Sequence, residues 1–313
     1  MSIEPAAIFR LDDIAVFDET HLRELISDVS GAVPLSIAGG AFAADESLAE
    51  SLAESPYADL AARIEQSLSP ADRATFARAR QQACANVERE TSRQAMLKTL
   101  FWELVYWKMP DDYDLLTAGE QVHLGALDVA RVDGAIVLDA AAGAGRITLP
   151  LARRARLVYA LDAAPPLLRV LERKIASADI RNVELLRGLF RRIPLPDDSV
   201  DATISCSAFG PLEARGGGRG LDELQRVTRE GGRIVILRPE DPAWFVARGF
   251  QYVSLPGQLT ITFPTLADAL DVTARFYGQD AVRHLETTRR PELPYHTLGV
   301  NAPRDICWLT VRK

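Results

Sequence analysis

The chain has 313 residues, enough for one large domain or two ordinary ones, and its 48% hydrophobic and 25% charged residues are typical of a folded globular protein. No apolar run reaches the ~18 residues of a membrane span, and a net charge of −7 argues against a surface that coats nucleic acid. Three widely spaced cysteines suggest neither a disulfide framework nor a metal site, and the N-terminus does not resemble a signal peptide, so we expect a cytoplasmic protein.

Residues 1–92 are expected to form an all-helical module, because apolar residues such as Leu22, Leu25 and Ile26 recur at helical spacing. Residues 93–130 follow as a linker or cap rich in aromatic residues. These aromatic residues either pack the helical module onto a sheet or cover a ligand pocket. On the second interpretation, Tyr113 and His123 are candidate catalytic residues, by residue type alone.

From Ala135 the chain alternates strands and helices, which predicts parallel βαβ units in a doubly wound α/β sheet. Two later segments, near 282–287 and 306–312, resemble strands and are expected to pair as an antiparallel hairpin at the sheet edge. The other expected strands are 135–139, 157–161, 183–187, 201–205 and 233–237, with helices near 145–155, 165–177, 219–229 and 266–277.

A turn of small residues, from Ala140 to Gly145, follows the first of these strands. Small side chains at Ala141, Gly143 and Gly145 would let a ligand lie against bare backbone. Asp162 ends the second strand, where a carboxylate can accept hydrogen bonds from the two hydroxyls of a ribose. The glycine spacing does not supply the full dinucleotide fingerprint, so an adenosine ligand without a pyrophosphate fits better.

Residues 133–238 resemble the class I S-adenosylmethionine-dependent methyltransferases. The resemblance is carried by the motifs VLDAAAGAG, IPLPDDSVD and LDELQRVTREGGRIVIL. It implies a seven-stranded Rossmann-like sheet, a methyltransferase domain over residues 131–313, and S-adenosylmethionine as the cofactor.

The same resemblance implies roles for individual residues of the small-residue turn and of the later strand ends. Ala141, Gly143 and Gly145 would hold the methionine and ribose parts of the cofactor, and Asp139 would orient the turn or the cofactor amine. Leu189 departs from the family, which often has an acid here to bind the adenine amine. The implied cofactor-binding set is Asp139, Ala140, Ala141, Gly143, Gly145, Asp162 on the ribose, Ala163 beside the adenine, Gly188, Leu189, and Ser205 through its backbone.

A second resemblance covers residues 9–87, which are similar to the C-terminal helical domain of the flagellar motor switch protein FliG. It is carried by FRLDDIAVFDETHLRELISDV followed by PLSIAGGA. Glu65 and Arg73 match the charged interaction surface of that family, whereas Ile64 departs from it. The resemblance implies a module that binds a protein partner or self-associates; a plain helical cap or dimer surface is the alternative.

The sequence is less informative about the acceptor than about the cofactor. The run RGGGRG, 215–220, either binds an anionic group or forms a surface loop. Aromatic residues after the fifth strand either line an acceptor pocket or pack in the core; these are Trp244, Phe245, Phe250, Tyr252 and Phe263. The sequence predicts methyl transfer to a small, partly apolar organic acceptor. The alternative is a non-catalytic cofactor sensor or scaffold, and methylation of a protein or RNA is disfavoured by the charge.

Overall fold

The computed structural model describes residues 105–211, 215–277, 279–298 and 304–313, together with Ala62, Pro70 and Trp102. The expected helical module over residues 1–92, with its motor-switch resemblance, therefore lies outside the described residues except for two isolated positions. Among the helices that are described, none is long and apolar enough to cross a membrane.

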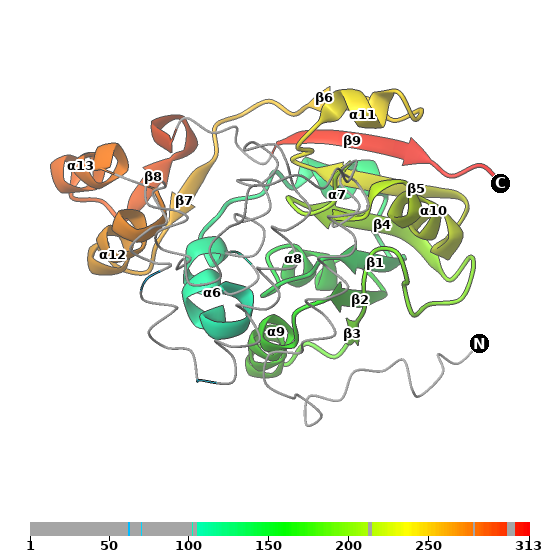
Figure 1. The fold of residues 1–313 in the computed structure, drawn as a ribbon, viewed down its shortest axis with the longest axis horizontal. Helices are drawn as coiled ribbons and strands as arrows, with labels where there is room; N and C mark the ends of the chain where they lie inside the picture. The colour runs from blue at the N-terminus through cyan, green and yellow to red at the C-terminus, as the bar shows by residue number, and fades with distance from the viewer. Residues whose placement is uncertain are drawn as a thin grey trace, which may run out of the picture.

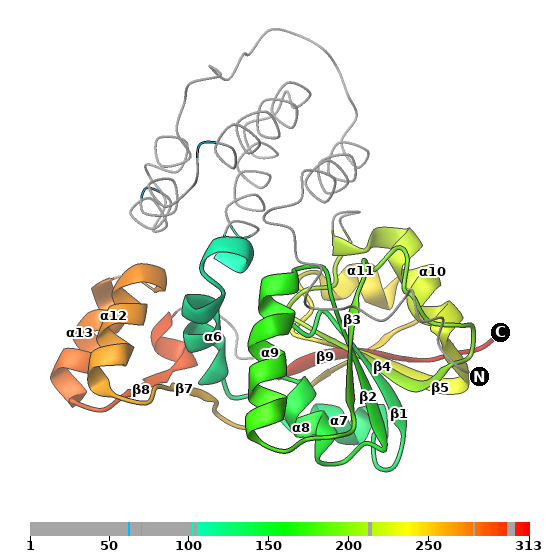
Figure 2. The same cartoon turned by 90° about the horizontal axis from the view of Figure 1, so that it is seen from below.

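A seven-stranded sheet forms the centre of the described structure, in the order β3-β2-β1-β4-β5-β9-β6, which Figure 1 labels from bottom to top and Figure 2 shows turned by 90°. The first five strands are parallel, and β9 runs antiparallel between β5 and β6. This topology confirms the doubly wound, seven-stranded, Rossmann-like sheet. The strands are β1 (Ile136–Ala140), β2 (Leu157–Asp162), β3 (Val183–Arg187), β4 (Val200–Cys206), β5 (Thr228–Leu237), β6 (Gln251–Ser254) and β9 (Asp305–Thr310).

Helices cover both faces of this sheet, as the continuous apolar strands require. Successive residues of a strand point to opposite faces, so Val137 packs with α7 and α8 while Leu138 packs with α10 and α11. Helix α9 lies against β2 and β3. The bounds are α7 (Gly125–Ala130), α8 (Thr148–Ala152), α9 (Pro165–Ser177), α10 (Gly217–Val227) and α11 (Pro242–Val246).

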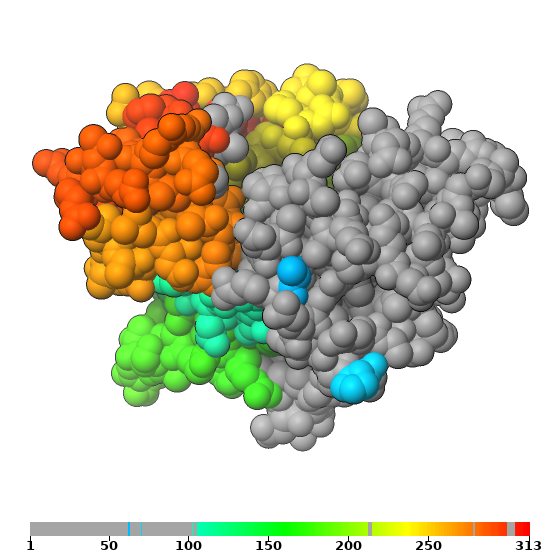
Figure 3. Space-filling view, turned by 60° about the vertical axis from the view of Figure 1, so that its left-hand side comes forward, coloured from blue at the N-terminus to red at the C-terminus, as the bar shows by residue number. Residues whose placement is uncertain are grey.

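A small lobe sits beside the carboxyl ends of the parallel strands (Figure 1). It consists of α6 (Pro110–Ala118), α12 (Leu266–Phe276), α13 (Gln279–Thr288), β7 (Thr260–Thr262), β8 (Glu292–Pro294) and the 3-10 helix η4 (Tyr295–Leu298). The Thr262 N–H donates to the Gly119 carbonyl at 2.9 Å, and Arg275 of α12 pairs with Asp112 of α6. Segments from both halves of the chain therefore build this lobe, and the space-filling view shows the orange surface of α12 directly above the teal surface of α6 (Figure 3).

The structure corrects one part of the predicted tail. Residues 282–287, expected as a strand, belong to helix α13, because Ala281 and Leu285 are buried at a spacing of four residues. The expected hairpin is therefore wrong. Strand β9 pairs instead with β5 and with β6, which lies about fifty residues earlier in the chain.

Candidate functional site

A cavity opens where β1, β2 and β4 end, at the point where the strand order reverses direction. This is the place where open α/β sheets hold their ligands. The small-residue turn forms its floor, and the small lobe forms the opposite wall. The lining includes Trp102, Tyr106, Tyr113 and Thr117 on the lobe side, and Asp139, Ala141–Ala144, Arg146, Leu161–Ala164, Gly188–Arg191 and Cys206–Ala208 on the sheet side.

Asp162 joins the turns that follow β1 and β2. One carboxylate oxygen accepts from the Gly143 N–H at 2.7 Å, and the other accepts from the Ala164 N–H at 2.8 Å. An ionised carboxylate offers about four acceptor positions, and the two backbone amides take one on each oxygen. Asp162 lines the cavity and is 8% exposed, which places a fixed hydrogen-bond acceptor at the cavity wall.

Asp139 lies deeper, at the end of β1, and is 1% exposed. One oxygen accepts from the Thr148 hydroxyl at 2.6 Å, whereas the other is buried and has no hydrogen-bond partner among the described residues. Burial raises the pKa of this carboxyl to about 7. Because Asp139 lines the cavity, a cationic ligand group would satisfy the unpartnered oxygen.

Three residues of the predicted cofactor set lie behind the cavity surface, and the other seven line it. Gly145 packs instead against α9: a Cβ on it would lie 2.5 Å from the Leu171 side chain. Ser205 is fully buried, and the cavity surface at the end of β4 is formed by the next residues, Cys206 and Ser207. Ala140 is also fully buried.

The structure separates the two candidate catalytic residues. Tyr113 of α6 lines the cavity above the turn: its Cε1 and hydroxyl oxygen lie 3.6 and 3.9 Å from the position of a Cβ on Gly143. His123 lies outside the cavity, which corrects its predicted placement over the pocket. Its Nε2 lies 2.9 Å from the Pro256 carbonyl, and its Nδ1 accepts from the Gly125 N–H, so both ring nitrogens serve local structure.

Aromatic side chains form the lobe side of the cavity, and we call Trp102, Tyr106 and Tyr113 the aromatic wall. Tyr106 and Tyr113 meet edge to face at 4.9 Å, and Trp102 stacks on Phe276 of α12 at 6.2 Å. Burial raises the pKa of Tyr113, which keeps its hydroxyl neutral. The three side chains of the aromatic wall therefore line a pocket, as the second interpretation predicted, whereas the helical module of the first interpretation lies outside the described residues.

The aromatic residues after β5 do not line the cavity. Phe245 and Phe250 are buried in the core with Phe209, and Tyr252 is 45% exposed. The glycine-rich run, in contrast, reaches the cavity: Arg215 lines it, and the following glycines begin α10. A Cβ on Gly216 would lie 2.2 Å from the Phe209 ring, so the run is packed into the fold rather than a free surface loop.

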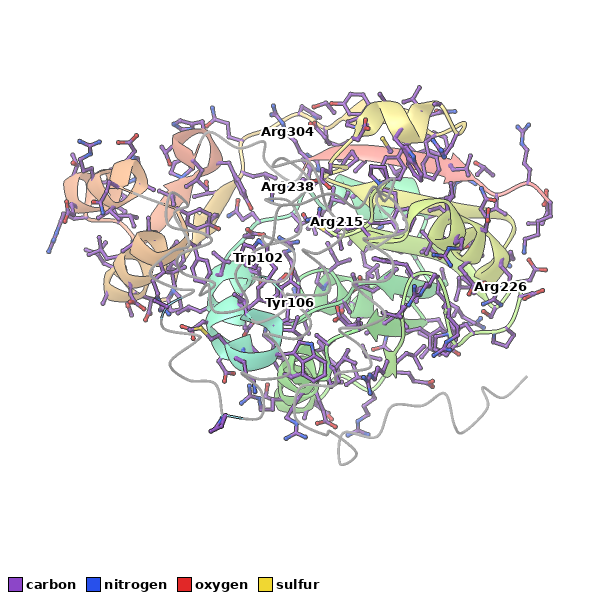
Figure 4. The ribbon with its side chains drawn as sticks, viewed as in Figure 1. Trp102, Tyr106, Arg215, Arg226, Arg238 and Arg304 are labelled. Atoms are coloured by element: carbon purple, nitrogen blue, oxygen red, sulfur yellow. The ribbon has the colours of Figure 1, made fainter. Side chains whose placement is uncertain are left out.

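Two arginines that line the cavity, Arg146 and Arg215, form ion pairs; Arg215 is labelled in Figure 4. Arg146 pairs with Glu120, which lies just beyond α6, and the two side chains are 14% and 8% exposed. Arg215 bonds Glu240 at 2.8 Å. Sequence reasoning missed Arg146 as a site residue, although its position directly after Gly145 was a signal. It also did not name Trp102 and Tyr106 as site residues, although both belong to the predicted aromatic cap.

Comparison with known proteins supports the assignment of the sheet to a methyltransferase domain. Residues 137–232 match a family model described as a methyltransferase domain. A demethylmenaquinone methyltransferase of Clavibacter sepedonicus is 40% identical over 124 residues, which is 39% of this chain and 49% of that protein. A U6 snRNA (guanine-N(2))-methyltransferase, THUMPD2 of Bos taurus, is 38% identical over 113 residues, or 34% of this chain and 23% of that protein.

Among solved structures, a SAM dependent methyltransferase from Aquifex aeolicus is 25% identical, covers 40% of this chain and 71% of that one, and has a TM-score of 0.35. The chain spans about half the length of the demethylmenaquinone methyltransferase that it matches. The motifs, the strand order and the family match together show that residues 137–232 form a class I methyltransferase domain, a class whose methyl donor is S-adenosylmethionine.

Proposed function

We propose that the protein transfers a methyl group from S-adenosylmethionine to a small, partly apolar organic acceptor. The observation that carries this proposal is the cavity itself. It holds the Asp162 carboxylate and the unpartnered oxygen of Asp139 on one side, and an aromatic wall on the other. A nucleoside with a cationic amino-acid tail fits the first side, and a flat organic molecule fits the second.

On the donor side, each polar group has a proposed partner. Asp162 accepts from the ribose hydroxyls, since its carboxylate is already held in place by two backbone amides. The free oxygen of Asp139 accepts from the amino group of the methionine part. Ala163 and Leu189 lie against the adenine, while Ala141 and Gly143 leave bare backbone beside the ligand.

Methyl transfer needs an in-line approach of the acceptor to the methyl carbon, and S-adenosylmethionine supplies that methyl on an electrophilic sulfonium. The residues of this chain contribute positioning and exclusion of water. Holding the two reactants in near-attack geometry can supply about 7–11 kcal/mol of the barrier reduction. The aromatic wall faces the turn, so it is placed to hold a flat acceptor beside the donor.

The acceptor itself is proposed at the level of its class. A ring-bearing acceptor, such as the demethylmenaquinone in the relative's name, would lie against Trp102, Tyr106 and Tyr113. Aromatic faces of this kind favour flat apolar ligands with offset-stacked or edge-to-face contacts. The cavity therefore supports a small, partly apolar acceptor.

Calorimetric titration with S-adenosylhomocysteine, the demethylated product, tests the donor site. Gly143→Val places a branched side chain at the cavity floor, and we expect it to weaken binding by at least about tenfold, which is about 1.4 kcal/mol. Gly134→Val is the matched control, because Gly134 also has a positive φ (69°, against 53° at Gly143) but lies in open space away from the cavity.

The results of this titration distinguish a methyltransferase from a non-catalytic cofactor sensor. The enzyme is supported if the wild type binds S-adenosylhomocysteine, Gly143→Val loses it and Gly134→Val retains it. A wild type that takes up no S-adenosylhomocysteine contradicts the proposed function. Binding without methyl transfer to any ring acceptor would favour the cofactor sensor instead.

A further inference from the structure

Arg146 carries a guanidinium in the cavity lining, held from behind by the small lobe. Its partner Glu120 does not line the cavity. Glu120 is itself held, because its backbone bridges to Ile261 of β7 and its carboxylate lies 3.4 Å from the Tyr277 hydroxyl. A guanidinium has five N–H donors, so one carboxylate does not use all of them.

The charges of the cavity lining have partners or assigned roles. Arg215 pairs with Glu240, and the two lining carboxylates among the described residues, Asp139 and Asp162, are assigned to the donor. Arg146, whose partner Glu120 lies behind the cavity surface, supplies a cation on the lobe side. The other titratable groups near Arg146 are the hydroxyls of Tyr113, Tyr277 and Tyr295 and the Cys206 thiol. The described part of the cavity also offers no histidine that could remove a proton from a neutral acceptor.

We propose that the acceptor binds as an anion, an ionised oxygen on a flat apolar ring, held by Arg146 with Tyr113 donating its hydroxyl beside it. This inference rests on the proposed methyl transfer and specifies its substrate class. A charge-assisted hydrogen bond from a guanidinium to an oxyanion is shorter and about twice as strong as a neutral one. The buried Arg146–Glu120 pair keeps the cation fixed before the acceptor arrives.

An ionised acceptor makes a catalytic base unnecessary. A lone pair of the acceptor oxygen forms the new bond to the methyl carbon, and the carbon–sulfur bond breaks with its electron pair going to sulfur. The acceptor loses its negative charge and the sulfonium its positive charge, giving a methyl ether or ester and a thioether. No proton moves in this step, so neither of the two carboxylates of the described lining, Asp139 and Asp162, is needed as a base and both remain assigned to the donor.

The carboxylate of the donor's own amino-acid tail is the other anion that Arg146 could bind. The geometry favours the acceptor, because Glu120, which pairs with Arg146, and Tyr277, which bonds Glu120, adjoin the small lobe on the acceptor side. If Arg146 binds the donor carboxylate, its loss lowers the affinity for the donor. If Arg146 binds the acceptor, its loss removes the discrimination between charged and uncharged acceptors.

The test compares 4-nitrophenolate with 4-nitroanisole, an uncharged ring of similar shape, in calorimetric titrations with and without S-adenosylhomocysteine. Arg146→Met together with Glu120→Gln removes the cation without leaving a buried charge unpaired. Arg226→Met together with Glu223→Gln is the matched control, an arginine–glutamate pair on α10 that does not line the cavity and lies away from Trp102 and Tyr106 (Figure 4).

We expect the wild type and the control to prefer the phenolate by at least about tenfold, and the Arg146 variant by less than about threefold, with S-adenosylhomocysteine binding unchanged in all three. Tyr113→Phe tests the same site with a milder change and should weaken phenolate binding but not anisole binding. Equal binding of the two rings by the wild type would overturn the inference.

Two further outcomes are informative. If the Arg146 variant loses S-adenosylhomocysteine but keeps the phenolate preference, the bound anion is the donor carboxylate and the inference fails. If the wild type prefers the phenolate but does not bind S-adenosylhomocysteine, the anion site stands and the proposed methyl transfer fails.

Discussion

The carboxyl group of Asp139 links ligand binding to pH. Its pKa in the folded protein is about 7, against an ordinary value of 3.8, because burial penalises the charged form. The folded state therefore holds this proton more tightly than the unfolded chain does. Its contribution to the unfolding free energy is fully present below about pH 4 and is lost as pH rises through 7, at about 1.4 kcal/mol per pKa unit.

A cationic amino group beside Asp139 would lower the raised pKa of this carboxyl, since it stabilises the ionised carboxylate. We expect the affinity for S-adenosylhomocysteine to rise with pH between about 5 and 7, with release of a proton on binding in that range. Asp139→Asn should abolish both effects. Calorimetry in buffers of different ionisation enthalpy measures the released proton directly.

The control for this experiment is Asp133→Asn, which changes an exposed carboxylate paired with Arg154 outside the cavity. It should leave the pH dependence of binding unchanged. Proton release that persists in Asp139→Asn would show that another group titrates, and the proposed contact of Asp139 with the amino group would be wrong.

At this scale, sequence reasoning found the residues that a local motif encodes. The structure places three of these residues on the cavity, namely Asp139, Gly143 and Asp162. They belong to strand ends and turns whose spacing can be recognised in the sequence. Arg146 was missed because its role depends on Glu120, which reaches it only through tertiary packing. His123 was misplaced because residue type does not reveal its bonds to Gly125 and Pro256.

Among the elements, the central strands β1 and β2 were predictable because their apolar runs are buried on both faces of the sheet. Helix α9 has the expected bounds, 165–177, since Pro165 begins it and its apolar positions repeat at helical spacing. Helix α13 was not predictable as a helix from so short a segment, because only Ala281 and Leu285 define its buried side. The pairing of β6 with β9 depends on long-range contacts that no local pattern contains.

Gly145 ties the turn to α9, and this contact gives a prediction about stability. Gly145→Ala would place a Cβ 2.5 Å from Leu171 at a φ of +98°, and we expect it to lower the unfolding free energy by about 1–3 kcal/mol. Gly257→Ala controls for the backbone strain alone, since Gly257 has a φ of +121° in open space. Chemical denaturation measures each variant.

A double-mutant cycle with Leu171→Ala identifies the clash. If the Cβ and Leu171 collide, the double variant should be at least about 1 kcal/mol more stable than the sum of the two single changes. Additive effects would indicate that backbone strain, and not the approach of α9, makes glycine necessary here.

At the scale of the whole molecule, the cavity lies between two bodies, the sheet with its helices and the small lobe, which side-chain ion pairs join: Asp111 and Asp114 with Arg173 and Lys174 of α9, and Glu120 with Arg146. The sheet contributes the turn and Asp162, and the small lobe contributes the aromatic wall and the support of Arg146. The lobe is connected internally through the Gln121 N–H to the Thr260 carbonyl at 3.3 Å and the Thr262 N–H to the Gly119 carbonyl. A ligand that touches only one body should therefore stabilise mainly that body.

Hydrogen exchange tests this division by ligand. S-adenosylhomocysteine alone should slow exchange of the Gly143 and Ala164 amides, which bond Asp162, by at least about tenfold, while changing the Gln121 and Thr262 amides by less than about threefold. Addition of 4-nitrophenolate should then slow exchange of the Gln121 and Thr262 amides as well, because the anion binds Arg146 and thereby stabilises the small lobe. The Val311 amide, at the far end of the sheet, is the internal control for global stabilisation. Equal slowing at all five amides by the first ligand would contradict a two-body cavity, since the small lobe would then respond to the donor alone.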